Sequence, residues 1–288
     1  MNKNNFGIML AVLAAALYAI STPISKLLLD YIPSILLAGL LYLGAGIGMG
    51  VFGLISKTAG KNRNERGLER SDMPYTLAMV VLDVAAPILL LLGLSLATAE
   101  NVSLLNNFEI VATALIARLF FGERVSRRLG VAITLITLSS IILSFENIGA
   151  FKFSVGSLLV LLATACWGLE NNCTRKLSDK DPLQIVIIKG LCSGAGSMII
   201  GIAIGERVED IGIIVTALAL GFVAYGLSIF VYVYAQRHIG AAKTSAYYAI
   251  APFIGSMLSL MIFREIPHPS FFIAMVIMGI GSYLAAKE

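Results

Sequence analysis

Four ionisable side chains lie within long apolar stretches of the sequence, where a charge is costly. They are Asp83, Glu109, Glu170 and Lys189. A charge at the centre of a membrane helix costs about 2.5–3.5 kcal/mol on insertion scales, so such residues face a protein interior or water and often mark a substrate or proton path. We therefore predict that these four residues line a binding cavity and that a buried carboxylate among them can carry a proton.

Glu170 and Lys189 are the pair whose approach can be predicted from chain geometry. Glu170 precedes, and Lys189 follows, a short polar turn at 177–182. At about 1.5 Å of helical rise per residue, the two side chains reach similar depths, so we expect them to meet. Two interpretations stay open: a fixed ion pair that holds helices together, or a pair that opens when a substrate or proton arrives. Buried pairs add little net stability, yet losing one partner costs several kcal/mol.

The other two charges have polar or helix-distorting neighbours. Asp83 lies four residues before Pro87, and a proline removes a backbone hydrogen bond from its helix. Proton coupling through Asp83 or Glu109 is one hypothesis, and a structural hydrogen bond to a neighbouring helix is the alternative. Asn106 lies three residues before Glu109, on the same face of an expected helix. This patch either lines the cavity or joins helices, as asparagine commonly does in membranes.

Asn171 and several aromatic residues complete the set of candidate cavity residues. Asn171 directly follows Glu170 in the polar stretch WGLENNCTRK. The aromatic candidates are Tyr18, Trp167, Tyr225, Tyr232, Tyr247 and Tyr248. Packing, or a place in the aromatic belt at the membrane surface, is the alternative for each of them.

The elements that must position these residues are membrane helices. The 288 residues are 58% hydrophobic and only 13% charged, with a mean hydropathy of +0.89, whereas soluble domains are about one quarter charged. Apolar runs near the roughly 20-residue length of a membrane helix occur at 7–29, 33–56, 74–97, 102–121, 129–145, 155–176, 183–205, 211–236, 242–263 and 270–286. Strands of membrane barrels are shorter and alternate in polarity. The sequence predicts an all-α integral membrane protein with ten transmembrane helices.

Several function classes are disfavoured by the rest of the sequence. The longest polar segment, 57–72, is a loop too short to be a soluble domain. The three cysteines lack metal-ligand spacing, so we expect no metal and no cofactor. There is no HExxH motif, and the two histidines, His238 and His268, lie at the ends of predicted helices, so we do not expect an enzyme. An intramembrane enzyme and a membrane scaffold are the weakest alternatives.

Positive charge predicts the orientation of the chain. With the N-terminus in the cytoplasm and ten alternating helices, most of the 21 lysines and arginines lie on the cytoplasmic side, as the positive-inside rule requires. Both termini are then cytoplasmic, and the location is the cytoplasmic (inner) membrane. The net charge of +4 is explained by these loops and gives no reason to expect a nucleic-acid partner.

The two halves of the chain resemble each other. Residues 16–33 align without a gap with residues 165–182, so that Tyr18 matches Trp167, and residues 115–126 resemble residues 257–268. The predicted repeats are 1–149 and 150–288. Each contains an odd number of helices, so the second enters the membrane from the opposite side. Such inverted repeats are typical of transporters that expose a central site alternately to the two sides of the membrane.

These motifs resemble those of EamA-type members of the drug/metabolite transporter superfamily, over essentially the whole chain. The stretch LFFGERVS contains Gly122, Glu123 and Arg124, and its counterpart LMIFREIPH contains Glu265. Pro252 lies where the family pattern places it, whereas the first half has Ile110 at the matching position. The resemblance implies a structural or gating role for these motif residues. It also implies a central cavity lined by the first, third, fourth, sixth, eighth and ninth helices.

The expected function is therefore secondary transport of a small metabolite by alternating access. Carboxylates, amides and a lysine together suit a zwitterion such as an amino acid, because each end of it finds an opposite charge. Export, with or without proton coupling, is the leading expectation, and the expected partners are this small-molecule substrate and the lipid bilayer. Drug-like or nucleotide-sugar cargo and a passive channel are alternatives. The chain is expected to be a monomer or a homodimer.

Overall fold

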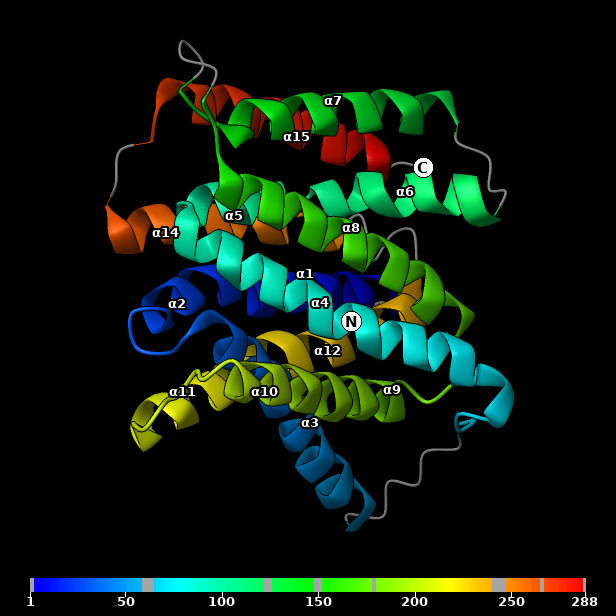
Figure 1. The fold of residues 1–288 in the computed structure, drawn as a ribbon. Coiled ribbons are helices and arrows are strands. Elements are labelled where there is room, and N and C mark those ends of the chain that lie inside the picture. Colours follow the sequence, from blue (N-terminus) through cyan, green and yellow to red (C-terminus); the bar gives the residue numbers. More distant parts are fainter. Residues whose placement is uncertain are drawn as a thin grey trace.

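The computed structural model describes residues 3–58, 65–121, 126–147, 152–177, 180–239, 247–264 and 267–286. Helices dominate these ranges, and a short antiparallel hairpin of β1 (Phe145–Asn147) and β2 (Lys152–Phe153) joins the two halves. Figure 1 shows the helices stacked into one bundle. The prediction of an all-α membrane protein is confirmed.

Helices lie in each of the ten stretches that were predicted from apolar length. The first half consists of α1 (Lys3–Ala19), α2 (Ser21–Leu28), α3 (Ser34–Thr58), the short η1 (Arg70–Asp72), α4 (Met73–Leu96), α5 (Ala99–Leu105), α6 (Phe108–Phe121) and α7 (Arg127–Ser144). The second half consists of α8 (Val155–Lys176), α9 (Pro182–Ile188), η3 (Lys189–Ser193), α10 (Gly194–Ala203), α11 (Ile211–Gly221), η4 (Phe222–Leu227), α12 (Ser228–Ile239), α14 (Ala251–Phe263) and α15 (Pro269–Ala286).

Counting only the described residues, six of these stretches are long and apolar enough to cross a membrane by length and composition alone. They are Asn5–Leu28, Ser34–Thr58, Arg70–Leu96, Ala99–Phe120, Pro182–Ala203 and Ile211–Ala235. Helix α8 is long enough, but its last two turns carry a glutamate, two asparagines, an arginine and a lysine. A helix this polar fits a membrane only where neighbouring helices cover its polar groups.

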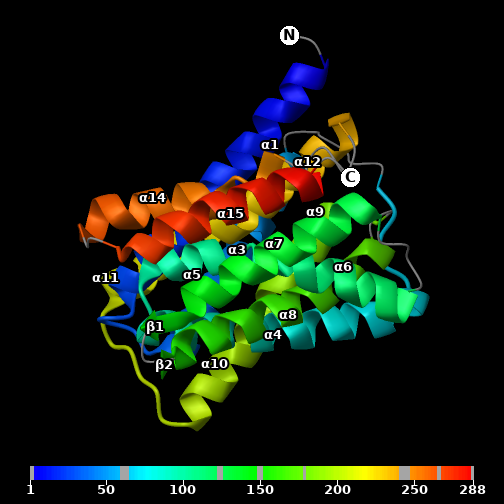
Figure 2. The same ribbon diagram turned by 90° about the horizontal axis from the view of Figure 1, so that it is seen from above.

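The packing of the helices has the two-fold character expected of inverted repeats. Helix α4 of the first half packs along α8, the first helix of the second half. The equivalent pair, α12 of the second half and α1 of the first, packs in the same way. Helix α3 crosses the continuous helix α9–η3–α10 and also contacts α11 (Figure 1). Helices α5, α7, α14 and α15 gather along one side of the bundle (Figure 2). The main hydrophobic core extends through both halves.

Several membrane stretches depart from regular α-helix. Pro23 cannot donate a hydrogen bond to the carbonyl of Ala19, and α1 ends at that residue. Residues 106 and 107 separate α5 from α6. The segments η3 and η4 are wide π-helical turns, a form that is frequent at functional sites. Irregular backbone near mid-membrane is typical of transporter sites.

Corresponding loop contacts hold the two ends of the bundle. The backbone N–H of Leu68 donates to Gln184 Oε1 at 2.9 Å, and Lys180 Nζ lies 3.1 Å from Glu69 Oε1; this hydrogen bond raises the pKa of Lys180. The equivalent contact, between a loop of the second half and a helix of the first, is made by the Leu36 N–H, which donates to Glu206 Oε2 at 2.8 Å. The loop before α4 thus contacts the start of α9, and the equivalent loop before α11 contacts the start of α3.

Replacing Glu206 with alanine is expected to destabilise the start of α3. The carboxylate satisfies an N–H group that the helix leaves free at its first turn, and its charge is favourable at that end of the helix dipole. Loss of such a cap costs about 0.5–2 kcal/mol. Thermal unfolding of the detergent-purified protein measures the effect, with the exposed neighbour Glu209→Ala as control. Equal midpoints for the two variants would show that the cap contributes nothing.

Candidate functional site

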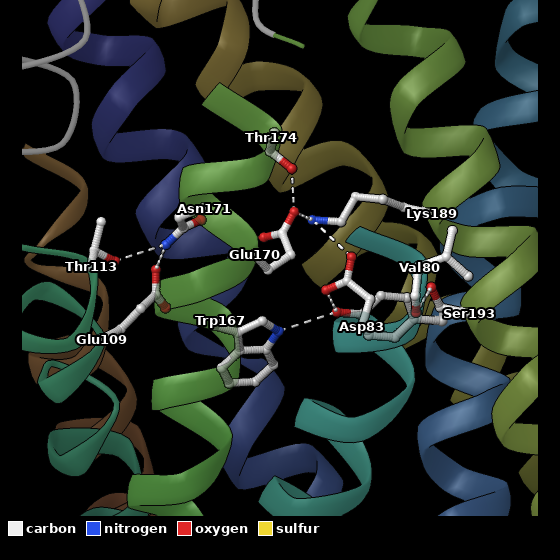
Figure 3. A network of polar contacts seen from close by, with 11 residues as sticks. Val80, Asp83, Glu109, Thr113, Trp167, Glu170, Asn171, Thr174, Lys189 and Ser193 are labelled. Atoms are coloured by element: carbon white, nitrogen blue, oxygen red, sulfur yellow. Dashed lines mark hydrogen bonds and ion pairs between the residues drawn. The ribbon is translucent and has the colours of Figure 1, made fainter. Parts of the chain in front are cut away.

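Three of the four charges predicted to be buried, Asp83, Glu170 and Lys189, meet between three helices from both halves. Lys189 Nζ lies 3.1 Å from Asp83 Oδ2 and 3.1 Å from Glu170 Oε1 (Figure 3). The exposed fractions of Asp83, Glu170 and Lys189 are 0%, 2% and 9%. We call these three residues the lysine triad. The predicted approach of Glu170 and Lys189 is confirmed, and Asp83 joins them from α4.

Neutral polar groups complete the coordination of the triad carboxylates. Tyr42 donates its hydroxyl to Asp83 Oδ1 at 3.0 Å, and Trp167 Nε1 donates to the Tyr42 hydroxyl at 3.4 Å. Thr174 donates to Glu170 Oε1. Sequence reasoning missed Tyr42, although it is the one tyrosine in the apolar stretch 33–56. Trp167, a predicted cavity residue, therefore reaches the triad through Tyr42.

The local backbone explains how the side chains of Asp83 and Lys189 are positioned. Asp83 lies one helical turn before Pro87, which leaves the Asp83 carbonyl without its usual helical partner. Lys189 opens the π-helical segment η3. In the same segment, Ser193 donates to the carbonyl of Val80 on α4 at 3.2 Å. The wide turn thus fixes Lys189 against the helix that carries Asp83.

Glu109 occupies a separate position on another side of α8. Asn171 Nδ2 donates to Glu109 Oε1 at 2.5 Å and lies 3.4 Å from Thr113 Oγ1 (Figure 3). The neighbouring Asn172 donates to the carbonyls of Thr113 and Gly168 at 3.2 and 2.8 Å. Both asparagines therefore join α8 to α6, Asn172 through a backbone carbonyl and Asn171 through the side chains of Glu109 and Thr113. Adjacent residues of α8 thus serve two polar sites, with Glu170 in the lysine triad and Asn171 at Glu109.

Five tyrosines form a connected cluster in the bundle, which we call the tyrosine cluster: Tyr18, Tyr42, Tyr225, Tyr232 and Tyr248. The ring centroids are 5.8 Å apart for Tyr18–Tyr225, 5.9 Å for Tyr18–Tyr248, 5.3 Å for Tyr42–Tyr225 and 4.9 Å for Tyr232–Tyr248. Ser21 donates to the Tyr225 hydroxyl at 3.2 Å. Tyr42 connects this cluster to the lysine triad.

The remaining predicted residues lie in other surroundings. Tyr247 is 38% exposed, so Tyr248 rather than Tyr247 supplies the ring in this part of the cluster. Asn106 is buried between α5 and α6, and its Oδ1 has no hydrogen-bond partner among the described residues. Pro252 lies in the first turn of α14, where a missing N–H is tolerated. The motif residues Gly122, Glu123, Arg124 and Glu265 lie outside the described residues.

The charges at the site do not balance. Asp83, Glu109 and Glu170 supply three carboxyl groups near mid-bundle, and Lys189 supplies one ammonium group. An uncompensated buried charge is costly, so the arrangement favours a bound cation or a bound proton. Within the described ranges, no three His, Cys, Asp or Glu side chains are grouped to hold a metal ion. The charged groups of the site are therefore three carboxyl groups and one ammonium group.

Comparison with known proteins gives the class to which this architecture belongs. The sequence model of the EamA-like transporter family matches residues 5–145 and 154–286. The chain therefore belongs to the EamA-like transporter family and is a multi-pass membrane protein.

Individual relatives agree with this assignment. An uncharacterised transporter of Methanothermobacter thermautotrophicus is 27% identical over 279 residues, covering 90% of this chain and 80% of that protein. The uncharacterised transporter YyaM of Bacillus subtilis is 22% identical over 183 residues, 60% of each chain. A solved crystal structure has the same fold, with a TM-score of 0.69 and 17% identity over 97% of this chain and 96% of that one.

Proposed function

We propose that this protein is a secondary transporter that exports a small zwitterionic metabolite, such as an amino acid, by alternating access. The observation that carries the proposal is the lysine triad, whose Lys189 is 3.1 Å from a carboxylate on each of two helices. A substrate carboxylate can replace Asp83 or Glu170 as a partner of Lys189. The substrate ammonium group can then neutralise the charge of a protein carboxylate. The exchange adds no net charge to the low-dielectric interior, because the zwitterion supplies one negative and one positive group.

The placement of the triad also supports alternating access. We assign residues 1–149 and 150–288 to the two repeats, with both termini on the cytoplasmic side of the cytoplasmic membrane. Asp83 then belongs to the first repeat, and Glu170 and Lys189 to the second. A movement of one repeat against the other changes the Asp83–Lys189 distance and leaves the Glu170–Lys189 pair within one body. Substrate binding at the triad is thereby coupled to the relative position of the repeats.

Proton coupling follows from the excess of carboxyl groups. Protonation of Asp83 or Glu109 removes one negative charge from the site. A proton and the substrate ammonium group therefore compete for the same carboxylates. Such competition is the simplest basis for proton–substrate exchange. The direction of transport is then set by the proton gradient.

Reconstitution into proteoliposomes tests the proposal. We expect uptake of at least one member of a panel of radiolabelled amino acids to depend on an imposed pH gradient, and unlabelled substrate inside the vesicles to accelerate it. Counterflow of this kind requires a carrier, so a leak indifferent to internal substrate would indicate a passive channel. Vesicles that take up no amino acid, but do take up a nucleotide sugar or a drug-like compound, would overturn the zwitterion assignment.

A further inference from the structure

The two carboxylate oxygens of Asp83 face different partners. Oδ1 accepts a hydrogen bond from the Tyr42 hydroxyl at 3.0 Å. Oδ2 accepts no hydrogen bond from a described residue and lies 3.1 Å from the ammonium group of Lys189 (Figure 3). The charged and titratable groups around Asp83 are Tyr42 from α3, Lys189 from η3 and, on the other side of that lysine, Glu170 from α8. Since Asp83 is completely buried, these contacts rather than solvent decide which oxygen takes up a proton.

Trp167 fixes the direction of the hydrogen bond from Tyr42. An indole N–H can only donate, so the contact of Trp167 Nε1 at 3.4 Å makes the Tyr42 oxygen an acceptor. The hydroxyl hydrogen is left for Asp83 Oδ1, and within the described ranges Tyr42 makes these two side-chain hydrogen bonds. The buried Tyr42 ring also packs against Tyr225, at a centroid distance of 5.3 Å. Trp167, Tyr42 and Asp83 Oδ1 thus form a chain of hydrogen bonds with one direction, which we call the donor chain.

A proton on Asp83 Oδ1 would disrupt the donor chain. The Tyr42 oxygen would have to accept from both Trp167 and Asp83, and its own hydrogen would lose its acceptor. A buried donor without a partner is costly. Oδ2 carries no such cost, because no hydrogen bond from a described residue ends on it. The donor chain therefore favours protonation at the oxygen that faces Lys189.

The position of this proton matters for Lys189. A proton on Oδ1 would leave Oδ2 as a carbonyl oxygen that still accepts from the ammonium group. A proton on Oδ2 both removes the negative charge and places a hydrogen between Asp83 and Lys189. The ammonium group then keeps Glu170, at 3.1 Å, as its ionic partner. Asp83 lies in the first half of the chain and the other two residues lie in the second, so this protonation breaks the ion pair that joins the halves.

We propose that Tyr42 and Trp167 are positioning residues for proton coupling, which direct the proton to Asp83 Oδ2 and so release Lys189 from the first half of the chain. The inference rests on the proposed function and deepens it. It assigns the coupling to Asp83 rather than Glu109, and it gives the proton a mechanical effect on the contact between the halves.

Trp167 supplies a probe of this protonation that needs no substrate, because it is the single tryptophan of the chain. Its fluorescence emission is measured as a function of pH in the detergent-purified, full-length protein, since indole emission responds to charges close to the ring. We expect a reversible change with pH in the wild type and its loss in Asp83→Asn. A wild-type emission that does not vary with pH, or a variation that survives in Asp83→Asn, would overturn the inference.

Uptake into proteoliposomes tests the role of the Tyr42 hydroxyl. Tyr42→Phe removes the donor to Oδ1, so a proton can bind there while Oδ2 still accepts from Lys189. We therefore expect Tyr42→Phe to lose the acceleration of uptake by a pH gradient and to keep counterflow of the same compound without a gradient. Trp167→Phe frees the Tyr42 hydrogen to turn away from Asp83 and is expected to weaken the acceleration in the same direction. The control is Tyr75→Phe, an exposed position on the helix that carries Asp83.

The two rates separate positioning from a purely structural role. Disturbed packing would lower counterflow and gradient-driven uptake in the same proportion. That result, or wild-type acceleration by the gradient in Tyr42→Phe, would overturn the inference and leave the transport function standing. Trp167→Phe provides the same comparison if Tyr42→Phe does not fold. If the emission of Trp167 follows Asp83 but the wild type transports no amino acid, protonation of Asp83 stands and the zwitterion assignment falls.

Discussion

Glutamine at position 170 is expected to abolish transport driven by a pH gradient while the protein remains folded. The side chain keeps its size, and its amide oxygen can still accept a hydrogen bond from Thr174. Lys189 keeps Asp83 as its ionic partner at 3.1 Å. The change therefore removes one negative charge from the site without leaving an unpaired lysine. Removing one member of a buried charge pair costs about 2–5 kcal/mol in binding, which corresponds to about a 30-fold or greater loss of affinity.

The measurement is initial uptake, into proteoliposomes with and without a pH gradient, of whichever compound the wild type transports. Glu209→Gln, at an exposed position, controls for the loss of a carboxylate. Lys189→Met provides the contrast, because it leaves two buried carboxylates without their cation and should lower stability by about 3–5 kcal/mol. Wild-type uptake by Glu170→Gln would reduce the Glu170–Lys189 contact to a fixed structural pair.

The sequence predicts those features that depend on local geometry. Apolar length identifies the membrane stretches because a helix must span a fixed thickness of hydrocarbon. The meeting of Glu170 and Lys189 was predictable for a similar reason: a short turn connects their helices, and the rise per residue sets their depths. The cost of charge in lipid indicated that Asp83 and Glu109 face inward. Each of these features depends on a single helix or on two helices that follow each other in the chain.

The partners that join these residues depend on how distant helices are rotated and packed. Asp83 and Lys189 are separated by more than one hundred positions in the chain, and no periodicity relates them. Tyr42 was missed because its stretch is otherwise apolar. Tyr247 and Tyr248 show the sensitivity to rotation most clearly. Neighbours on a helix point about 100° apart, and Tyr248 packs against the Tyr18 ring whereas Tyr247 is exposed.

Valine at position 44 is expected to prevent correct assembly of the two halves. A Cβ atom on Gly44 would lie 2.1 Å from the carbonyl oxygen of Leu218, and a Cβ atom on Gly221 would lie 2.0 Å from that of Leu41. The obstacle in both cases is backbone, which cannot rotate away as a side chain can. Helices α3 and α11 would have to separate along this contact, which joins the two repeats. The cost should exceed the roughly 1–3 kcal/mol of ordinary overpacking.

The yield of monodisperse protein after detergent extraction, and its thermal midpoint, measure this effect. Gly50→Val on the same helix is a matched control, because a Cβ atom there meets nothing within 4 Å, and both variants carry the same change in helix propensity. We expect near-normal yield for Gly50→Val and little folded protein for Gly44→Val. If both variants fold equally well, α3 and α11 can separate without loss of structure. The contact between the repeats would then be one that opens during transport rather than one that holds them together.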